Sequence, residues 1–290
     1  MFPWESSVSG KETVPGPSRY QHHISGSILH GLELASAWGL ISREEVRPVE
    51  RAVGTFYLER SVPGPSGREI RGTMSPDEFH TGDNDLYTNI LAERAARSVE
   101  PDVRFKRPQD EKGLLTYDSD GLRGYKQAAA VLAIYPLQDP EAEAQAEAMM
   151  ERFSEKVTKN GPAMSDSIHA TIWARLGKTE KAYETWHQSW RPFMKTGLML
   201  FSEKRNRPVT YFTTGAAGSL QAVLYGFAGL RVDRTEPQNV PWKMEMEGGY
   251  WMSCRPNLPA EWKSIKLKGI WIGDERVNLE IPNQGVRRYP

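Results

Sequence analysis

The chain has 290 residues, which is enough for one large or two modest domains. Its 37 acidic and 37 basic side chains cancel, so the charge does not indicate nucleic acid, an anionic membrane or a polyanionic substrate as a partner. The single cysteine, Cys254, excludes an internal disulfide and a cysteine-based zinc cluster. No apolar run reaches membrane-span length, and the first residues lack signal-peptide features. We therefore expect a cytoplasmic protein with a small neutral partner.

The first part of the chain predicts a short arm followed by two helices. Residues 1–23 are rich in Gly, Pro and Ser, but the run Phe2-Pro3-Trp4-Glu5-Ser6 is typical of a packed arm and not of a flexible tail. Apolar residues recur at helical spacing from Ile24 to about Ala35. Ser42-Arg43-Glu44-Glu45 is a capping box and predicts the start of the second helix.

The middle of the chain is punctuated by glycine and proline. The run Val62–Gly67 breaks the second helix, and a polar loop over residues 71–85 leads into a helix from about Leu86 to Ser98. Residues 99–124 show little periodicity and predict a loop. An apolar helix is expected from Tyr125 to before Pro136, and another helix from Pro140 to about Lys159 with proline near its first turn.

The last part of the chain changes from helical to alternating patterns. Helices are expected over Ser167–Leu176, Glu180–Trp190 and Gly218–Phe227, which makes about eight in all and suggests antiparallel helical hairpins. Around Tyr250–Met252, Trp262–Trp271 and Val277–Ile281, apolar and polar residues alternate as in half-buried antiparallel strands. We therefore predict a domain boundary near Val232, with one domain over 1–232 and another over 233–290.

The loop over residues 71–89 carries the densest set of chemically capable side chains. Asp77 and Glu78 are adjacent, His80 follows, and Asn, Asp, Tyr and Thr residues are presented by irregular backbone, as in a polyol-binding site. The alternative is a solvated turn that caps the next helix. In that reading Asp83, Asn84 or Asp85 would be the N-cap residue.

This loop resembles a motif of glycoside hydrolase family 65. The matching residues are Ser75-Pro76-Asp77-Glu78-Phe79-His80, Asn84 and Tyr87-Thr88-Asn89. The family includes trehalases, glucosylgalactosyl-hydroxylysine glucosidases and disaccharide phosphorylases. Further segments resemble family motifs, among them Phe2–Ser6, Lys126–Gln127, Asp166–Ala170, Tyr211–Gln221 and Leu258–Ser264, so the resemblance covers Met1 to about Ile281.

The resemblance implies the fold. Family 65 catalytic domains are (α/α)6 barrels of twelve helices, and a small β domain follows. With about eight helices, this chain is expected to be mainly α, with a partial (α/α)6 barrel over 1–232 and a small antiparallel β domain over 233–290. The Phe2–Ser6 segment lies deep inside longer polypeptides of the family. We therefore expect a chain that starts in mid-fold, as a fragment or as a protein that needs a partner or forms a homo-oligomer.

The resemblance also implies the catalytic pair. Inverting hydrolysis needs an acid that protonates the leaving oxygen and a base that activates water, with carboxyl groups about 6.5–9.5 Å apart. Glu78 matches the general acid of the family, and Glu203 matches the general base of its hydrolase branches. Without the resemblance, Glu203 would be read as a surface glutamate paired with Lys204 or Arg205.

Further residues would surround the glucose. The resemblance places Trp4, Glu5, His80, Lys126 and Gln127 there, whereas Ala129 stands where the family usually has aspartate. By themselves, Lys126 and Gln127 are equally compatible with an exposed first helical turn. His169 is expected either to border the pocket or to pack between helices. The histidine spacing does not suit a metal site and the family uses no metal, so neither metal nor cofactor is expected.

Two other functions remain as alternatives. A phosphorylase needs a phosphate-binding loop, which in that branch of the family contains histidine. No histidine follows His187, so the hydrolase interpretation is favoured. The third hypothesis is a non-catalytic carbohydrate-binding protein, because an incomplete pocket wall weakens the positioning on which catalysis depends.

Overall fold

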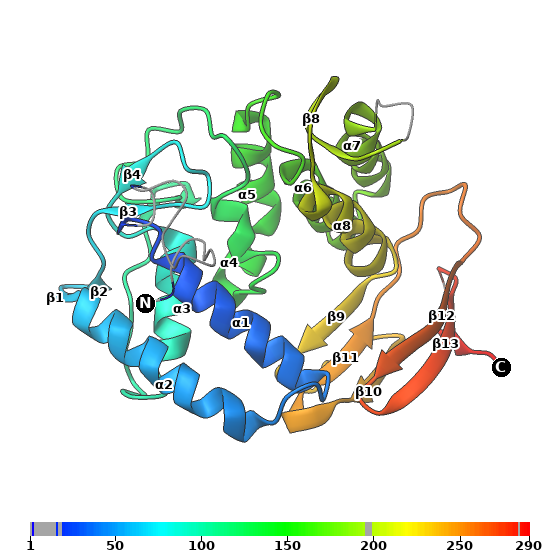
Figure 1. The fold of residues 1–290 in the computed structure, drawn as a ribbon, viewed down its shortest axis with the longest axis horizontal. Coiled ribbons are helices and arrows are strands. Elements are labelled where there is room, and N and C mark those ends of the chain that lie inside the picture. The colour runs from blue at the N-terminus through cyan, green and yellow to red at the C-terminus, as the bar shows by residue number, and fades with distance from the viewer. Residues whose placement is uncertain (1, 3–15, 17–18, 195–198, 284) are drawn as a thin grey trace. The chain divides into compact units, whose positions relative to one another are not determined.

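The computed structural model describes residues 2, 16, 19–194, 199–283 and 285–290. The chain divides into two compact units, one of Met1–Glu33 with Arg43–Thr158 and one of Leu34–Ser42 with Lys159–Pro290. Both contain helices and small antiparallel sheets (Figure 1). Within the described residues, no helix is both long enough and apolar enough to cross a membrane.

The first unit contains helices and three small hairpins. Its α-helices are α1 (His23–Ala37, of which residues 23–33 belong to this unit), α2 (Arg43–Arg60), α3 (Leu86–Ala96), α4 (Pro140–Ala144) and α5 (Ala146–Phe153). The hairpins pair β1 (Val62–Gly64) with β2 (Gly67–Glu69), β3 (Thr73–Met74) with β4 (Thr81–Gly82), and β5 (Gln109–Asp110) with β6 (Gly113–Leu114). Its short 3-10 turns include Ala130–Ala133 and Ser154–Lys156.

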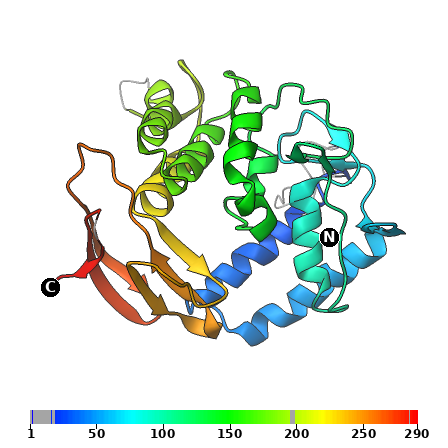
Figure 2. The ribbon, with the colours of Figure 1, turned by 180° about the vertical axis from the view of Figure 1, so that it is seen from behind.

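The helix boundaries in this unit follow local sequence signals. Helix α2 begins directly after Ser42, as the capping box predicts, and ends before the Val62–Gly67 break, which forms the β1–β2 hairpin. Helix α3 begins at Leu86 because the side chain of Asp85 accepts the Thr88 N–H at 2.8 Å. Helices α2 and α3 pack against each other (Figure 2).

The prediction of a helix from Tyr125 to before Pro136 is wrong. Only the 3-10 turn Ala130–Ala133 forms there. The backbone of Tyr125 is taken up by another segment, since its N–H donates to Lys156 O at 2.9 Å and its carbonyl accepts from Thr158 N at 2.8 Å. These tertiary hydrogen bonds replace the i to i−4 pattern that a helix would need.

The helix predicted from Pro140 to about Lys159 is interrupted. Proline does occupy the first turn of α4, and Asp139 caps it. The helix stops at Gln145, whose φ and ψ of −108° and 10° are not helical, and a second helix, α5, follows. The Gln145 side chain accepts the Leu114 N–H at 3.1 Å, so this residue joins the helix pair to strand β6.

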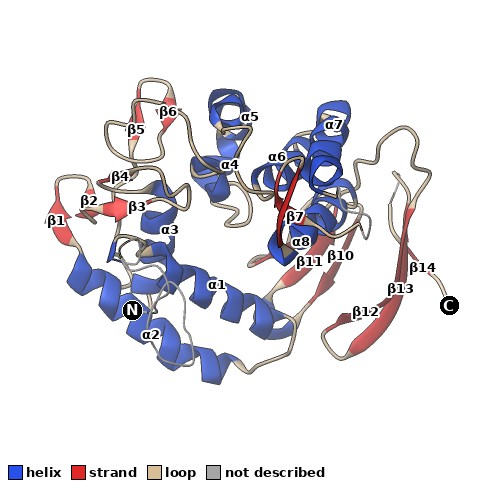
Figure 3. Cartoon of the chain, turned by 45° about the horizontal axis from the view of Figure 1, so that its top comes forward, coloured by secondary structure: helices blue, strands red, loops and turns tan. Residues whose placement is uncertain are grey.

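The second unit contains helices and three small sheets. Its α-helices are α6 (Ser165–Arg175), α7 (Thr179–Trp190) and α8 (Thr213–Gln221), and a π-helix (Ala222–Phe227) continues α8. Its strands are β7 (Ser202–Lys204), β8 (Arg207–Tyr211), β9 (Leu230–Asp233), β10 (Trp242–Glu245), β11 (Trp251–Cys254), β12 (Ile265–Ile272), β13 (Glu275–Ile281) and β14 (Arg287–Arg288). Short 3-10 turns in this unit include Arg191–Phe193 and Glu247–Gly249, and its strands are drawn in red in Figure 3.

The predicted elements of the second unit are largely confirmed. Helices α6 and α7 lie where expected, and α8 begins at Thr213, earlier than the predicted Gly218. Strands β11, β12 and β13 match the three alternating segments. The boundary near Val232 stays a prediction; strand β9 runs across it and pairs with β11.

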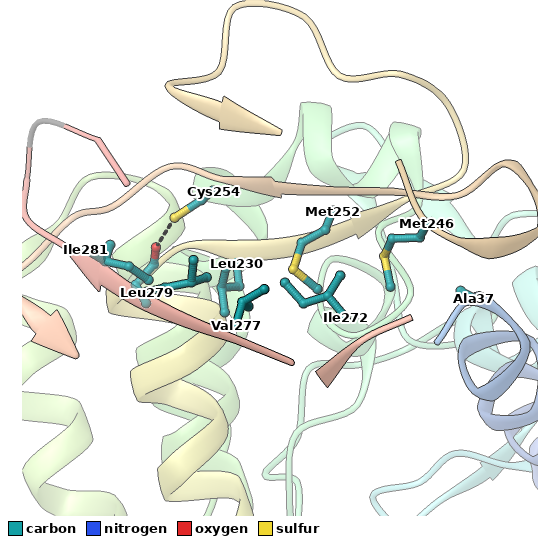
Figure 4. Close-up of a cluster of buried hydrophobic side chains, with 10 residues drawn as sticks. Ala37, Leu230, Met246, Met252, Cys254, Ile272, Val277, Leu279 and Ile281 are labelled. Carbon is teal, nitrogen blue, oxygen red and sulfur yellow. Dashed lines mark hydrogen bonds between the residues drawn. The ribbon is translucent and has the colours of Figure 1, made fainter. Parts of the chain in front are cut away.

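An apolar cluster joins the last two three-stranded sheets of the second unit. The sheets have strand orders β10-β11-β9 and β12-β13-β14. The buried members are Ala37, Ala228, Leu230, Met246, Met252, Cys254, Ile272, Val277, Leu279 and Ile281 (Figure 4). The Cys254 thiol donates to Ala228 O at 2.9 Å, and burial raises its pKa to about 12. This residue is therefore part of the core and not a reactive thiol.

Candidate active site

The β3–β4 hairpin presents the loop with the family motif. Thr73 pairs with Gly82 and Met74 with Thr81, so residues 75–80 form the connection. A tight turn begins this loop, because Glu78 N donates to Ser75 O at 3.0 Å. The chain that leads into α1 packs beside the hairpin, with Met74 N donating to Tyr20 O at 2.8 Å.

Asp77 anchors this loop from within. Its side chain is fully buried, and one carboxylate oxygen accepts the backbone N–H of Lys126 at 2.8 Å. The other oxygen lies 3.4 Å from His80 Nδ1. Burial raises the pKa of Asp77, although the Lys126 N–H opposes this change. Asp77 therefore fixes the bend at Lys126 against the motif loop, a role that the sequence interpretation did not assign to it.

Glu78 has a different environment from its neighbour. Its carboxylate is 26% exposed and forms an ion pair with the Lys126 ammonium group. Its backbone φ is 64°, a left-handed conformation that costs a non-glycine residue about 1 kcal/mol. Such conformations persist where the surrounding structure imposes them, and they are frequent at functional sites. The loop therefore holds this one carboxylate in a strained, accessible position.

Lys126 and Gln127 lie in a bend ahead of the Ala130–Ala133 turn, and not in the first turn of a helix. Gln127 donates from its side-chain nitrogen to Pro76 O, so both residues contact the motif loop. The Gln127 side-chain oxygen is buried and accepts no hydrogen bond from the described residues. A buried acceptor without a partner is costly, so a ligand hydroxyl would be favourable there.

His80 ends the loop within a group of aromatic rings. Its ring centroid lies 6.2 Å from that of Tyr117 and 6.0 Å from that of Tyr125. The Tyr125 hydroxyl donates to Asp120 at 2.6 Å, which fixes that ring. Phe79, between Glu78 and His80, is 57% exposed. His80 is thus oriented by packing and by Asp77, while the ring beside it faces solvent.

Part of the polar motif is structural, as the alternative interpretation proposed. Asp85 is buried and accepts the N–H and the hydroxyl of Thr88 at 2.8 and 2.6 Å, so it is the N-cap of α3. Asn84 accepts from Ile70 N at 3.0 Å and donates to Asp118 at 2.8 Å. These residues hold the hairpin on α3 and are not available to a sugar.

Glu203 lies in strand β7 of the second unit. Its carboxylate is 31% exposed and lies 3.8 Å from the Lys204 ammonium group. Arg205, the other partner considered, instead pairs with Asp166. Just before strand β7, the ring of Phe201 stacks on that of Phe193, with centroids 5.8 Å apart. This accessible position is compatible with a general base and also with a surface glutamate paired with Lys204.

The predicted site residues therefore fall into three groups. Glu78, His80, Lys126 and Gln127 are brought together in the first unit. Glu203 belongs to the second unit. Trp4 and Glu5 lie outside the described residues. His169 is buried in α6, where burial lowers its pKa to about 4, as in a helix-packing histidine.

Comparison with known proteins finds relatives that are named as glycosidases. The chain is 27% identical over 304 residues to a kojibiose hydrolase from Mucilaginibacter mallensis, an alignment that covers 93% of the chain and 42% of that protein. It is 28% identical over 323 residues to a protein-glucosylgalactosylhydroxylysine glucosidase from Gallus gallus, covering 99% of the chain and 43% of that protein. The chain is thus similar to family 65 glycosidases.

The chain spans less than half of the length of the curated proteins that it matches. A solved structure described as a kojibiose phosphorylase from the human microbiome shares its fold, with a TM-score of 0.72 at 12% identity over 98% of the chain and 46% of that structure. No protein-family model matches the chain. The resemblance seen in the motif loop thus extends over nearly the whole sequence.

Proposed function

We propose that the protein is an inverting glycoside hydrolase that releases glucose from α-linked glucosides, with Glu78 as general acid. The observation that carries this proposal is the motif loop, in which buried Asp77 holds a strained, accessible Glu78 beside Lys126. A general acid must reach the leaving oxygen while its backbone stays in place. The anchored backbone and the accessible carboxylate of this loop support the assignment of Glu78.

The neighbouring polar groups suit a sugar. The Lys126 ammonium group has three donors, so a sugar hydroxyl can share it with Glu78. The buried Gln127 oxygen, which accepts no hydrogen bond from the described residues, would accept one from a second hydroxyl, and His80 belongs to the same loop. Trp4 and Glu5 complete the proposed glucose site on the strength of the motif resemblance alone. The partner is then a small neutral sugar, and no cofactor is needed.

Glu203 is the proposed general base. In the inverting reaction its carboxylate would deprotonate water, which attacks the anomeric carbon while Glu78 protonates the departing oxygen. Because the two glutamates belong to different units, this pairing rests on the family motif and not on a measured separation. The partial (α/α)6 barrel is part of the same proposal, supported by the fold likeness to the phosphorylase structure.

The test is glucose release by the purified chain from kojibiose, trehalose and glucosylgalactosyl-hydroxylysine. We expect Glu78→Gln and Glu203→Gln each to lower kcat by at least about 100-fold, the usual scale for a lost acid or base. Glu50→Gln, which alters an ion pair with Arg43 in α2, is the matched control and should keep full activity. With glucosylgalactosyl-hydroxylysine, which releases a single glucose, proton NMR should show β-glucose as the first anomer.

The fold likeness to a described phosphorylase favours one alternative, which the same assay separates. Strict dependence on inorganic phosphate, with a glucose phosphate as product, would establish a phosphorylase. Retained activity in Glu78→Gln would refute the assigned acid. No turnover of any substrate by a folded chain would favour the non-catalytic, carbohydrate-binding alternative.

A further inference from the structure

The outer face of the β12–β13 hairpin carries a second group of ligand-binding side chains, well apart in sequence from the motif loop. Strand β12 exposes Lys266, Lys268 and Trp271, while β13 presents Arg276 and Asn278 on the same face. The opposite face of the hairpin enters the buried cluster through Ile272, Val277, Leu279 and Ile281. The outer side chains are therefore not required by the core.

A bulge shapes this face into a hollow. The pairing register shifts between Leu267 and Ile270, and Gly269 has a φ of 64°. Asn278 accepts the Gly269 N–H at 2.8 Å, while Arg276 donates to Gly269 O at 3.4 Å. A Cβ atom on Gly269 would lie 2.7 Å from the Arg276 guanidinium group, so the absent side chain leaves room for it.

The hollow is lined by Lys268, Gly269, Arg276 and Asn278 and has a volume of about 380 Å³. That volume is near the lower end of the range for small-molecule sites, about 300–1,000 Å³. The site is open, so it suits a ligand that lies on the surface and extends beyond it.

The two cations that line the hollow, Lys268 and Arg276, have no acidic partner among the described residues. On this face Lys266 lies 3.6 Å from Glu280, so these two charges offset each other. Lys268 and Arg276 form no ion pair within the described part of the chain. Both charges are therefore available to a ligand, although the formal net charge of the whole chain is zero.

An exposed aromatic residue is paired across the strands with one of the residues that line the hollow. Trp271 is 59% exposed and is the cross-strand partner of Arg276. An indole ring in this position offers an apolar platform for a pyranose ring, while guanidinium and ammonium groups bind carboxylate or sulfate oxygens. Nucleic acid would demand a longer run of cations than two.

We propose that this face, made of Lys268, Trp271, Arg276 and Asn278, is an ancillary site for an acidic oligosaccharide that carries carboxylate or sulfate groups. Arg276 and Lys268 bind the anionic group, Trp271 stacks against a sugar ring, and the Asn278 amide donates to a hydroxyl. The site performs no chemistry, and its existence does not depend on Glu78 or Glu203.

Titration with defined oligosaccharides tests the site. Trigalacturonate and a sulfated trisaccharide should bind the full chain, and neutral maltotriose should bind this face at least about tenfold more weakly, since it lacks the charge-assisted hydrogen bonds. Arg276→Gln and Trp271→Ala should each weaken binding of the acidic sugar by about tenfold. Lys243→Gln, which removes one exposed charge from strand β10, should leave binding unchanged.

Other outcomes overturn the proposal. Equal binding by all three variants, each checked for an unchanged melting temperature, would exclude this face. Equally tight binding of a short single-stranded DNA would show a general anion surface instead. Binding by Glu78→Gln should match that of the unmodified chain, so failure of the proposed hydrolase and failure of this site are separate results.

Discussion

Two neighbouring carboxylates in the motif loop have opposite surroundings, although the sequence presents them as a pair. Asp77 is fully buried and accepts hydrogen bonds, whereas Glu78 is partly exposed and forms an ion pair with Lys126. The difference follows from the left-handed backbone at Glu78, which turns successive side chains in different directions. Asp77 is thus suited to hold the loop and Glu78 to act on a ligand.

Asp85 gives a pH-dependent prediction at the same scale. Burial raises its pKa from 3.8 to about 6. Because the folded-state pKa is the higher one, the stability that this group contributes is complete below about pH 3.8 and is lost as the pH rises through about 6. Asp85→Asn keeps an acceptor for Thr88 and does not ionise. Its stability relative to the unmodified protein should therefore increase by up to about 3 kcal/mol from pH 4 to pH 7.

Urea unfolding at pH 4, 5, 6 and 7 measures this difference. Asp85→Ala is the control, because it also loses the helix cap and should be less stable than Asp85→Asn at every pH, by about 1 kcal/mol. A stability difference between Asp85→Asn and the unmodified protein that stays constant across this pH range would contradict the assignment.

At the scale of elements, the contact between α2 and α3 depends on a glycine. A Cβ atom on Gly54 would lie 2.5 Å from the carbonyl oxygen of Ala95, so the two helices could not keep their spacing. Glycine in a helix interior normally costs about 1 kcal/mol relative to alanine. Replacing the glycine by alanine would favour the helix locally, but the added Cβ would overpack the contact with α3. We therefore expect Gly54→Ala to lower the free energy of unfolding by about 1–3 kcal/mol.

The matched control is Gly31→Ala in α1. Apart from its chain neighbours and the backbone of its own helix, no heavy atom of the described residues lies within 4 Å of a Cβ placed there, so the same change should raise stability by about 0.5–1 kcal/mol. Thermal unfolding of both variants gives the comparison. Equal shifts in the same direction would mean that helix propensity, and not packing, decides the effect.

The incorrectly predicted helix after Tyr125 belongs to this scale as well. Its apolar and alanine-rich sequence favours a helix locally, but Asp77 takes the Lys126 N–H and residues 156–158 take the Tyr125 backbone groups. The hydrogen bonds that decide the conformation come from residues distant in sequence. Local propensity could not reveal them.

At the scale of the whole molecule, Cys254 is a natural reporter of unfolding. It is the single cysteine of the chain, it is fully buried, and its pKa is raised to about 12. We expect dithionitrobenzoate at pH 8 to react with the native protein at least about 100-fold more slowly than with the protein in guanidinium chloride. The labelling midpoint should coincide with that measured by circular dichroism.

The Cys254→Ser variant, which has no thiol, controls for noncovalent colour changes. Native labelling within tenfold of the denatured rate would show that the sheets around Cys254 open readily, contrary to the packed cluster. Labelling at lower denaturant than the loss of helix would mean that this cluster unfolds before the helices do.

Sequence patterns alone were enough to predict the similarity to family 65 glycosidases, most helix starts and strands β11, β12 and β13. These depend on short-range signals, namely the motif around Glu78, the capping box at Ser42 and the alternation in β12 and β13. Which polar residues are structural could be seen only from the tertiary contacts. Asp77, Asn84 and Asp85 are used within the fold, while Glu78 stays accessible, because burial and hydrogen-bond partners arise only when distant segments meet.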